Sequence, residues 1–487
     1  MATLSTDNFA QYIIEQTEHL DKIAIKDDIR TITYSELASS IRRYATHLRN
    51  QGIKRGDRVA MCMSDSIEWT IGFLAVTLIG GSPVLISPKV ISSRLADMLD
   101  NAEPNGFIYD PNEITPPVID NIIYLPVTNI VGEYEEYNKF HKFNHDSVGM
   151  LATTSGTSGG TQQFITHRHA IFKYELPVYI KCYDVTAESI VASTPTLSFH
   201  YGTLNAILTL ALGATFIMSA RIPSRQQVCN LVRDNRVTHL FSTPTILANM
   251  TRGIESSSDL AGLTHMICAA EFLPNAVEEK FKEIYNKDIL CGLGLGEMTS
   301  WVTYQHPTMR KFGTIGKPIP DIEIEIRRED GTICELGELG EFYLKGPHSA
   351  LGYWNNWAMT KERFFGKWFK TKDMGFVDDE GFYTYVCRAD DLIKVNSSFV
   401  SPNEIENAIS QHDAVSECIV LSYPGISGMT EIAAKIVLIP DKTSSAGNIR
   451  KFLADKLESH KIPKIIEFVT DIPKTITAKK IRKHTIG

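Results

Sequence analysis

The chain has 487 residues, of which 43% are hydrophobic and 22% are charged, a composition typical of an ordinary globular protein with roughly three domains. Its net charge of −8 excludes a general nucleic-acid binder, because phosphate backbones select basic surfaces. Its eight cysteines form no CxxC pair, which argues against a zinc site and a disulfide scaffold and indicates free thiols in a reducing compartment.

The N-terminus lacks the basic-then-apolar pattern of a signal peptide. The longest apolar run, Trp69 to Ile86, is interrupted by glycines and a proline. It therefore predicts a buried helix followed by a strand, not a membrane span. We expect a cytoplasmic protein.

The first half of the chain alternates helical and strand-like patterns. The spacing predicts helices at Ser35–Gln51 and Glu68–Ile79, and strands at Arg58–Met63, Pro83–Ile86, Val237–Phe241 and His265–Cys268. Such alternation indicates an α/β fold with largely parallel sheets.

The pattern changes after Gly313. Ile322–Arg327 and Glu341–Lys345 alternate like antiparallel strands joined by glycine-rich turns, and they predict a small β-barrel. These segments complete an N-terminal domain that we expect to span residues 1–388.

A compact α+β unit is predicted for residues 389–487. Its expected elements are helices at Asn403–Gln411 and Ala446–Ser459 and strands at Val415–Ser422 and Glu431–Leu438. The charged segment Arg388–Asp391 lies between strands, which suits a hinge, so we expect this small C-terminal domain to be mobile.

The loop Thr153–Thr161 is rich in glycine and hydroxyl side chains. Glycines let backbone N–H groups approach phosphate oxygens, and the hydroxyls add donors. The loop is not a P-loop of the GxxxxGK[ST] type, and on composition alone a flexible surface loop is the commoner case. The candidate phosphate ligands are Thr154, Ser155, Gly156, Thr157, Ser158 and Gly159.

This loop resembles the phosphate loop of the adenylate-forming superfamily of acyl- and aryl-CoA synthetases. Further segments match that family in chain order and cover almost the whole chain. They are Thr33–Leu37, Gly56–Val59, Ser198–His200, Cys268–Pro274, Gly292–Met298, Thr371–Asp373, Arg388–Lys394, Val400–Glu406 and Lys479. The form of the adenine segments is most similar to that of benzoate-type CoA ligases.

The resemblance implies that a carboxylate attacks the α-phosphorus of ATP, and that a thiol then captures the acyl-adenylate. Lys479 would bridge the carboxylate and the α-phosphate, Glu297 would bind Mg²⁺, and Asp373 would accept hydrogen bonds from the ribose with help from Arg388. The residues around the adenine would be Ala270, Glu271, Gly294, Leu295 and Gly296. The acid pocket would be lined by Phe199, His200, Tyr201, Gly202 and Gly294, and His200 would also be catalytic.

Each of these side chains also has a plainer interpretation. Lys479 lies in a basic tail that solvent alone would accommodate, and Glu297 suits the start of a helix. Asp373 and Arg388 fit a loop ion pair, and His200 fits a buried core histidine.

By the same resemblance, the C-terminal domain rotates between the two half-reactions. Asp390 would be the hinge residue, and Lys394, Ser397 and Ser398 would line the channel for the thiol. The acceptor would be coenzyme A or the phosphopantetheine of a carrier protein.

The chain departs from the family pattern at several positions. Gln162 stands where a lysine follows the phosphate loop, and Arg168 or His167 is our hypothetical replacement for that charge. Gly296 replaces a threonine, while Lys372 and Ser397 replace glycines. Ser397 would narrow the thiol channel.

The function that we expect is ATP-dependent activation of a small carboxylic acid, followed by transfer to a thiol. The benzoate-like segments and the lack of an aspartate near Phe199–Gly202 favour an aryl or acyl acid over an amino acid. Carrier-protein loading, capture by an amine and a non-catalytic nucleotide-binding relative stay open as alternatives.

Overall fold

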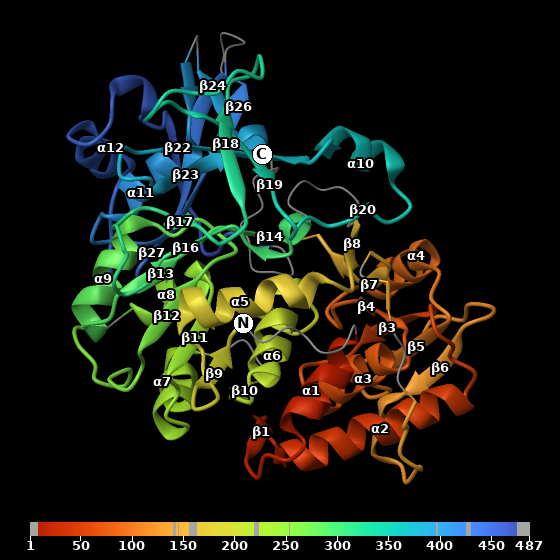
Figure 1. The fold of residues 1–487 in the computed structure, drawn as a ribbon. Coiled ribbons are helices and arrows are strands. Elements are labelled where there is room, and N and C mark those ends of the chain that lie inside the picture. The colour runs from red at the N-terminus through yellow and green to blue at the C-terminus, as the bar shows by residue number, and fades with distance from the viewer. Residues whose placement is uncertain are drawn as a thin grey trace.

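The structure is a computed structural model that describes residues 8–139, 143–144, 146–154, 163–218, 224–252, 254–395, 398–424 and 430–474. Figure 1 shows the N-terminal helices at one end of the molecule and the elements after residue 400 at the other. Among the described residues, no helix combines the length and apolarity that crossing a bilayer requires.

One seven-stranded sheet is built from the N-terminal part of the chain. Its order is β20-β8-β7-β4-β3-β5-β6, with parallel pairing from β7 to β6 and antiparallel pairing at β7–β8 and β8–β20. The strands are β3 (Arg58–Cys62), β4 (Ser82–Leu85), β5 (Gly106–Tyr109), β6 (Ile123–Pro126), β7 (Val148–Thr153), β8 (Phe164–Arg168) and β20 (Gly352–Tyr353).

A second seven-stranded sheet has the order β13-β12-β11-β9-β10-β1-β2 and is parallel except at β1–β2. Its strands are β1 (Ile23–Lys26), β2 (Thr31–Thr33), β9 (Ile190–Ser193), β10 (Thr215–Ile217), β11 (His239–Ser242), β12 (His265–Cys268) and β13 (Ile289–Cys291). Parallel strands require crossovers, and helices supply them.

Several of the helices begin at residues whose side chains cap their free N–H groups. Thr33 and Glu36 form a reciprocal capping box at the start of α2, and the Ser66 hydroxyl accepts from Trp69 N in α3. The helices are α1 (Phe9–Thr17), α2 (Tyr34–Asn50), α3 (Ile67–Leu78), α4 (Ser92–Ala102), α5 (Ile171–Tyr183), α6 (His200–Ala211), α7 (Arg225–Asp234), α8 (Pro244–Met250), α9 (Asn275–Tyr285) and α10 (Trp357–Arg363).

An antiparallel sheet follows, as predicted from the alternation after Gly313. It contains β18 (Glu323–Arg327), β19 (Gly340–Lys345), β21 (Phe364–Phe365), β22 (Trp368–Val377) and β23 (Tyr383–Arg388). Four two-residue strands precede it: β14 (Gly294–Leu295), β15 (Ser300–Trp301), β16 (Thr303–Tyr304) and β17 (Lys317–Pro318).

The last part of the chain has its own hydrophobic core, which includes Ile405, Val420 and Ile449. Its elements are β24 (Ile393–Val395), β25 (Ser398–Val400), α11 (Pro402–Ser410), β26 (Val415–Pro424), β27 (Thr430–Leu438), α12 (Ala446–Ala454) and β28 (Ile465–Phe468). The helix expected to reach Ser459 ends at Ala454. That prediction was too long because Leu453 is the last fully buried side chain there, and Asp455 and Lys456 face solvent.

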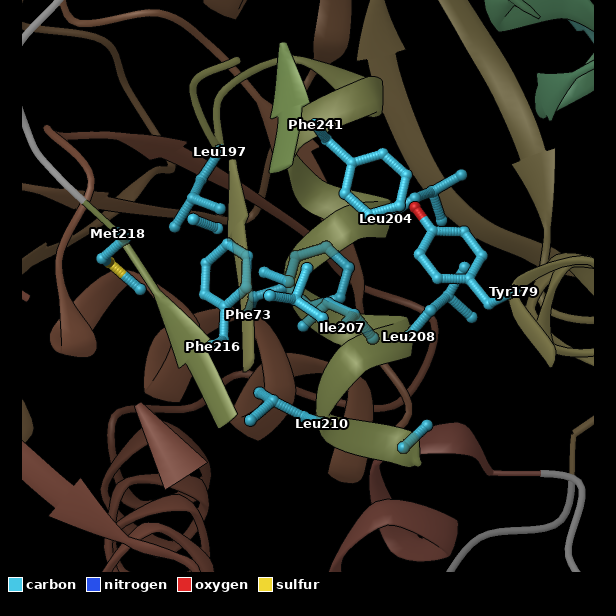
Figure 2. Close-up of a cluster of buried hydrophobic side chains, with 14 of the residues drawn as sticks. Phe73, Tyr179, Leu197, Leu204, Ile207, Leu208, Leu210, Phe216, Met218 and Phe241 are labelled. Atoms are coloured by element: carbon cyan, nitrogen blue, oxygen red, sulfur yellow. The ribbon is translucent and has the colours of Figure 1, made fainter. Parts of the chain in front are cut away.

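The main core joins the two large sheets into one body. Figure 2 shows Phe73 of α3 in the same buried cluster as Ile207 of α6 and Phe216 of β10, although these residues lie far apart in the sequence. This packing fixes the two sheets relative to each other, and therefore fixes the loops that leave their carboxyl ends.

Candidate active site

A cavity of about 560 Å³ lies where the carboxyl ends of the parallel strands converge. The residues that line it follow β3, β4, β7, β9, β11, β12 and β13 directly in the chain, and β22 and β23 add residues from the antiparallel sheet. The carboxyl edge of a parallel sheet is the usual place for a ligand in an α/β fold.

The glycine-rich loop connects β7 to β8. Thr154 N donates to the carbonyl of Gln163 at 2.8 Å, and Gln163 N donates to the Thr154 hydroxyl at 3.2 Å, so the two ends of the loop are held together. Thr154 and Gln163 both line the cavity. The predicted ligands Ser155, Gly156, Thr157, Ser158 and Gly159 lie outside the described residues.

Asp373 and Arg388 face each other on β22 and β23. Their Cα atoms are register partners, and the Arg388 guanidinium donates to Asp373 Oδ1 at 3.2 Å. Asp373 is 2% exposed, and its backbone N–H donates to the Thr371 hydroxyl at 2.9 Å. The structure therefore brings a fixed carboxylate and its cation together at the cavity wall.

Glu297 lies in the short 3₁₀ helix that follows β14, and it also lines the cavity. Its Oε1 accepts from the Tyr353 hydroxyl at 2.7 Å, and its carbonyl accepts from Ala350 N at 2.8 Å. Burial, and then the nearby Glu297, raise the pKa of Tyr353, so the phenol remains a donor. A carboxylate held in this way suits a hard divalent cation.

The expected adenine segments follow β12 and β13. Ala270, Glu271, Gly294, Leu295 and Gly296 line the cavity. Glu271 accepts from the Thr245 hydroxyl at 2.6 Å, and Ala270 has φ of 80° in the left-handed region. A Cβ at Gly296, where the family has a threonine, would meet Ile165 Cδ1 at 2.6 Å.

At another part of the wall, Phe199, His200 and Tyr201 line the cavity at the start of α6. Gly202 does not line it: a Cβ there would lie 2.1 Å from the Thr196 carbonyl, so this glycine serves close backbone packing. Both ring nitrogens of His200 and the Tyr201 hydroxyl are buried without a hydrogen-bond partner among the described residues. Burial lowers the pKa of His200 to about 3, so the ring is neutral.

Comparison with known proteins decides the family. The AMP-binding enzyme family matches residues 14–354, and its C-terminal domain matches residues 404–479. The chain belongs to the AMP-binding enzyme family.

Its relatives within this family include benzoate–CoA ligase of Thauera aromatica, which is 29% identical over 93% of this chain and 90% of the relative. A benzoate CoA ligase structure from Burkholderia xenovorans is 29% identical over 97% of this chain and 98% of that one, with a TM-score of 0.89. An anthranilate CoA ligase solved with anthranoyl-AMP is 25% identical over 97% and 95%, also with a TM-score of 0.89.

We expected Arg168 or His167 to replace the charge of the missing family lysine, and this prediction is wrong for both residues. Arg168 pairs with Asp146 at 2.8 Å and does not line the cavity. His167 is fully buried beside His200, and burial followed by His200 lowers its pKa well below the usual value, so it carries no charge. Both residues lie at the end of β8 that is far from the loop, where His167 pairs with Met150 and Arg168 pairs with Val148.

Arg363 of α10 lines the cavity and was not predicted. Its Nε donates to the Lys370 carbonyl at 2.6 Å, and its Nη2 donates to the Thr371 carbonyl at 2.8 Å. These bonds hold the guanidinium beside the strand that carries Asp373. At the start of α10, Asn356 donates to Gln163 at 2.9 Å, which places the helix against the base of the glycine-rich loop.

Asp65 is a second functional candidate that motif reading missed. It follows β3, lines the cavity and accepts from Leu197 N at 2.9 Å. Burial raises its pKa to about 7, although Leu197 N–H and Lys89 oppose the shift. Its only sequence signal was its position just after a parallel strand.

Of the predicted hinge and lid residues, Asp390 and Lys394 have described side chains, and neither lines the cavity. Asp390 forms an ion pair with Lys372 at 3.4 Å, and Lys394 is exposed on β24. The backbone of Ser398 begins β25, whereas Ser397 and Lys479 lie outside the described residues. The structure therefore leaves their predicted roles open.

Proposed function

We propose that this protein is an AMP-forming acid–thiol ligase for an aromatic carboxylic acid. In the first step the carboxylate and ATP give acyl-AMP and pyrophosphate. In the second step the thiol sulfur of coenzyme A attacks the acyl carbon, and AMP leaves. The observation that carries the proposal is a single cavity that contains the base of the glycine-rich loop, Glu297, and the Asp373–Arg388 pair.

We assign ATP to the side of the cavity that these residues line. Asp373 accepts hydrogen bonds from the two ribose hydroxyls, because an ionised carboxylate is only an acceptor and a vicinal diol offers two donors. Glu297 would hold Mg²⁺, which would offset the repulsion between two approaching anions. Lys479, whose position is a prediction from the family pattern, adds a cation during adenylation.

We assign the acid to the wall formed by Phe199, His200 and Tyr201. Trp301, Ile246 and Leu293 contribute further apolar surface to the cavity. A flat aromatic ring fits such a wall, and the Tyr201 hydroxyl and His200 nitrogens offer hydrogen bonds to a ring substituent. Benzoate and its hydroxy and amino derivatives are therefore the first substrates to test, in line with the names of the benzoate and anthranilate ligases.

Arg363 takes the place of the missing lysine in our proposal. It lines the same cavity as Thr154, Gln163 and Glu297. Its bonds to the two carbonyl oxygens use Nε and Nη2, which leaves Nη1 to donate to a phosphate. We expect Arg363→Gln to lower kcat/KM for ATP at least about tenfold, since one charged donor to a developing charge is worth that much or more. Arg363→Lys should retain part of the activity.

The decisive control is charge complementation. Gln162→Lys should restore activity to Arg363→Gln, whereas Lys361→Gln, on the exposed face of the same helix, should leave kcat/KM unchanged. If Gln162→Lys fails to rescue and Arg363→Lys behaves like Arg363→Gln, then Arg363 positions β22 and supplies no charge to the phosphates.

The acceptor is coenzyme A in this proposal, with a carrier-protein phosphopantetheine as the alternative. A panel of aromatic acids in a pyrophosphate-release assay, run with coenzyme A, with a phosphopantetheinylated carrier and without thiol, tests both steps. Acid-dependent pyrophosphate release with thioester formation on coenzyme A is the expected result. Thioester on the carrier alone would select the alternative.

A second candidate function is a non-catalytic nucleotide or acyl-adenylate binder. The loss of the family lysine at Gln162 favours it. Retention of Glu297, Asp373 and Arg388 in one cavity weighs against it. Binding of ATP without acid-dependent pyrophosphate release for any member of the panel would select this candidate.

A further inference from the structure

Asp184, His265 and His306 converge at the amino edge of the second sheet. Asp184 caps the C-terminus of α5, His265 opens β12, and His306 follows β16. One ligand atom from each residue lies within 4.8 Å of the other two. The cavity lies beyond the carboxyl end of β12, and none of these three residues lines it.

The tautomer of His265 is fixed by its neighbours. The Thr264 hydroxyl donates its only hydrogen to the Thr238 carbonyl at 2.8 Å, so it can only accept from His265 Nδ1, 3.0 Å away. Nε2 of His265 therefore presents a lone pair. His265 is 6% exposed, and its Nε2 has no hydrogen-bond partner among the described residues.

That lone pair faces a carboxylate, which calls for a cation between them. Nε2 of His265 lies 3.7 Å from Asp184 Oδ2, and the same oxygen lies 2.7 Å from His306 Nε2.

Without a metal, His306 carries its ring proton on Nε2, because Thr308 N–H donates to its Nδ1 at 3.2 Å and Nε2 lies 2.7 Å from Asp184 Oδ2, so metal binding requires the other tautomer. Its Nδ1 lies 2.7 Å from the Thr308 hydroxyl, which can accept the ring proton when Nε2 binds a metal. A threonine hydroxyl thus lies within hydrogen-bond distance of Nδ1 in both imidazoles, and at protein metal sites such a bond orients the histidine ligand. His239 stacks on His265 at 4.5 Å, but its nitrogens lie 2.8 Å from Thr238 Oγ1 and the Tyr183 carbonyl, so it is not a ligand.

We propose that Asp184, His265 and His306 bind one divalent transition-metal ion, with zinc as the best match. Two imidazole nitrogens and one carboxylate oxygen form a donor set that zinc accepts at about 2.0–2.2 Å, with water in the fourth position. Tetrahedral bonds of that length separate ligand atoms by roughly 3.3 Å. On binding, the distance from Asp184 Oδ2 to His306 Nε2 would lengthen from 2.7 Å, and the distance from Asp184 Oδ2 to His265 Nε2 would shorten from 3.7 Å, each by about half an ångström.

The bound ion would join the end of α5, the start of β12 and the segment after β16. These segments lie far apart in the sequence, so the ion would stabilise the folded chain and bind the unfolded chain poorly. The absence of a CxxC pair argues only against a zinc site made of cysteines. Cysteine spacing carries no information about a site made of histidine and aspartate. The proposal does not depend on the function of the cavity.

Zinc titration of the untagged, metal-stripped full chain by calorimetry tests the site. One saturable equivalent is expected for the natural protein. Asp184→Asn and His306→Gln should each weaken that binding by at least about 100-fold, because loss of a ligand costs more affinity than loss of a residue that only hydrogen-bonds to a ligand. Asparagine tolerates the left-handed φ of 53° at residue 184, so this variant retains the backbone.

His460→Gln is the matched control, because His460 also lies near a carboxylate, Glu458 at 3.7 Å, with no second histidine beside it among the described residues. Its zinc affinity should equal that of the natural protein. Thermal melting without metal verifies that each variant folds, and the zinc-induced rise in Tm should vanish only in the two site variants. Absence of saturable binding, or equal binding by all four proteins, would overturn the proposal.

Discussion

Lys372 is a residue with a backbone conformation that suits glycine. Its φ is 62°, and the family has a glycine at this position of the Thr-Gly-Asp segment. A side chain in the left-handed region costs about 1–2 kcal/mol relative to the right-handed one. The segment tolerates this because Thr371 and Asp373 are tied by their own hydrogen bonds on either side.

We predict that Lys372→Gly is more stable than Lys372→Ala by about 1 kcal/mol. Both variants lose the ion pair with Asp390, so their difference isolates the backbone term. Urea denaturation of the two variants measures it. Equal midpoints and slopes would show that residue 372 is relaxed in the native protein.

Asp65 predicts a pH dependence at the residue scale. Because its folded-state pKa is raised to about 7, protonation of Asp65 stabilises the fold. This stabilisation is complete below the unfolded pKa and is lost as the pH rises through about 7. An asparagine at this position would keep the bond from Leu197 N without a charge to bury.

Asp65→Asn should therefore gain stability relative to the natural protein between pH 6 and pH 8.5, by about 1–2 kcal/mol. The whole pKa shift of Asp65 corresponds to a larger free energy of unfolding, but the carboxyl group borders the cavity, where solvent screens its charge. Thermal melts across this pH range provide the measurement. A stability difference that does not change with pH would refute this account of Asp65.

At the scale of elements, helices and strands were predictable where the hydrophobic residues follow a single periodicity along the chain. The helix predicted at Ser35–Gln51 is α2 at Tyr34–Asn50, because its apolar stripe and its capping box agree. The strands β3, β4, β11 and β12 are short, almost fully buried runs, and they were predicted to within two residues at each end.

The cavity was less predictable than the elements around it. Glu297, Asp373 and Arg388 were found because motifs mark them. Asp65 and Arg363 have no motif, and only the packing of distant elements brings them to the same wall. Arg168 was a misleading choice, since nearness in sequence to the glycine-rich loop does not decide on which side of β8 a side chain lies.

A buried pair connects α5 to the loop that supports Glu297. His348 Nδ1 lies 2.9 Å from Glu175 Oε1, and both side chains are almost fully buried. Two residues later, Ala350 N donates to the Glu297 carbonyl at 2.8 Å. The pair therefore positions the backbone behind the candidate magnesium ligand.

Glu175→Ala should destabilise the protein by about 3 kcal/mol, because it leaves His348 buried without its partner. Glu175→Gln keeps a hydrogen-bonding group of the same size and should lose much less. Chemical denaturation gives the stability, and kcat/KM of Glu175→Gln reports positioning of Glu297. Similar stability for both variants would contradict the role assigned to the pair.

At the scale of the whole molecule, two separate cores raise the question of movement between them. Among the described residues, the polar contacts between the last part of the chain and the rest include Asn275 N to Asn407 at 2.9 Å, Asn403 to the Val386 carbonyl at 2.7 Å, and the Lys372–Asp390 pair. Polar contacts of this kind are expected at the interface of a unit that can rotate. We propose the boundary at residues 388 and 389.

Two reactions at one cavity explain why such a movement would be useful. Adenylation needs cations around the triphosphate, whereas thiol attack needs an open path to the acyl carbon. We predict that the domain carrying Lys479 approaches the cavity for the first reaction only. Lys479→Ala should then abolish adenylation and leave the second reaction largely intact.

The most direct test of this account measures the two half-reactions separately in Lys479→Ala and the natural protein. The first is acid-dependent ATP–pyrophosphate exchange with an aromatic acid, and the second is thioester formation from synthetic acyl-AMP and coenzyme A. We predict that exchange falls at least about 100-fold in the variant while thioester formation persists. Undiminished exchange in the variant, or no exchange in the natural protein with any aromatic acid, would contradict the account.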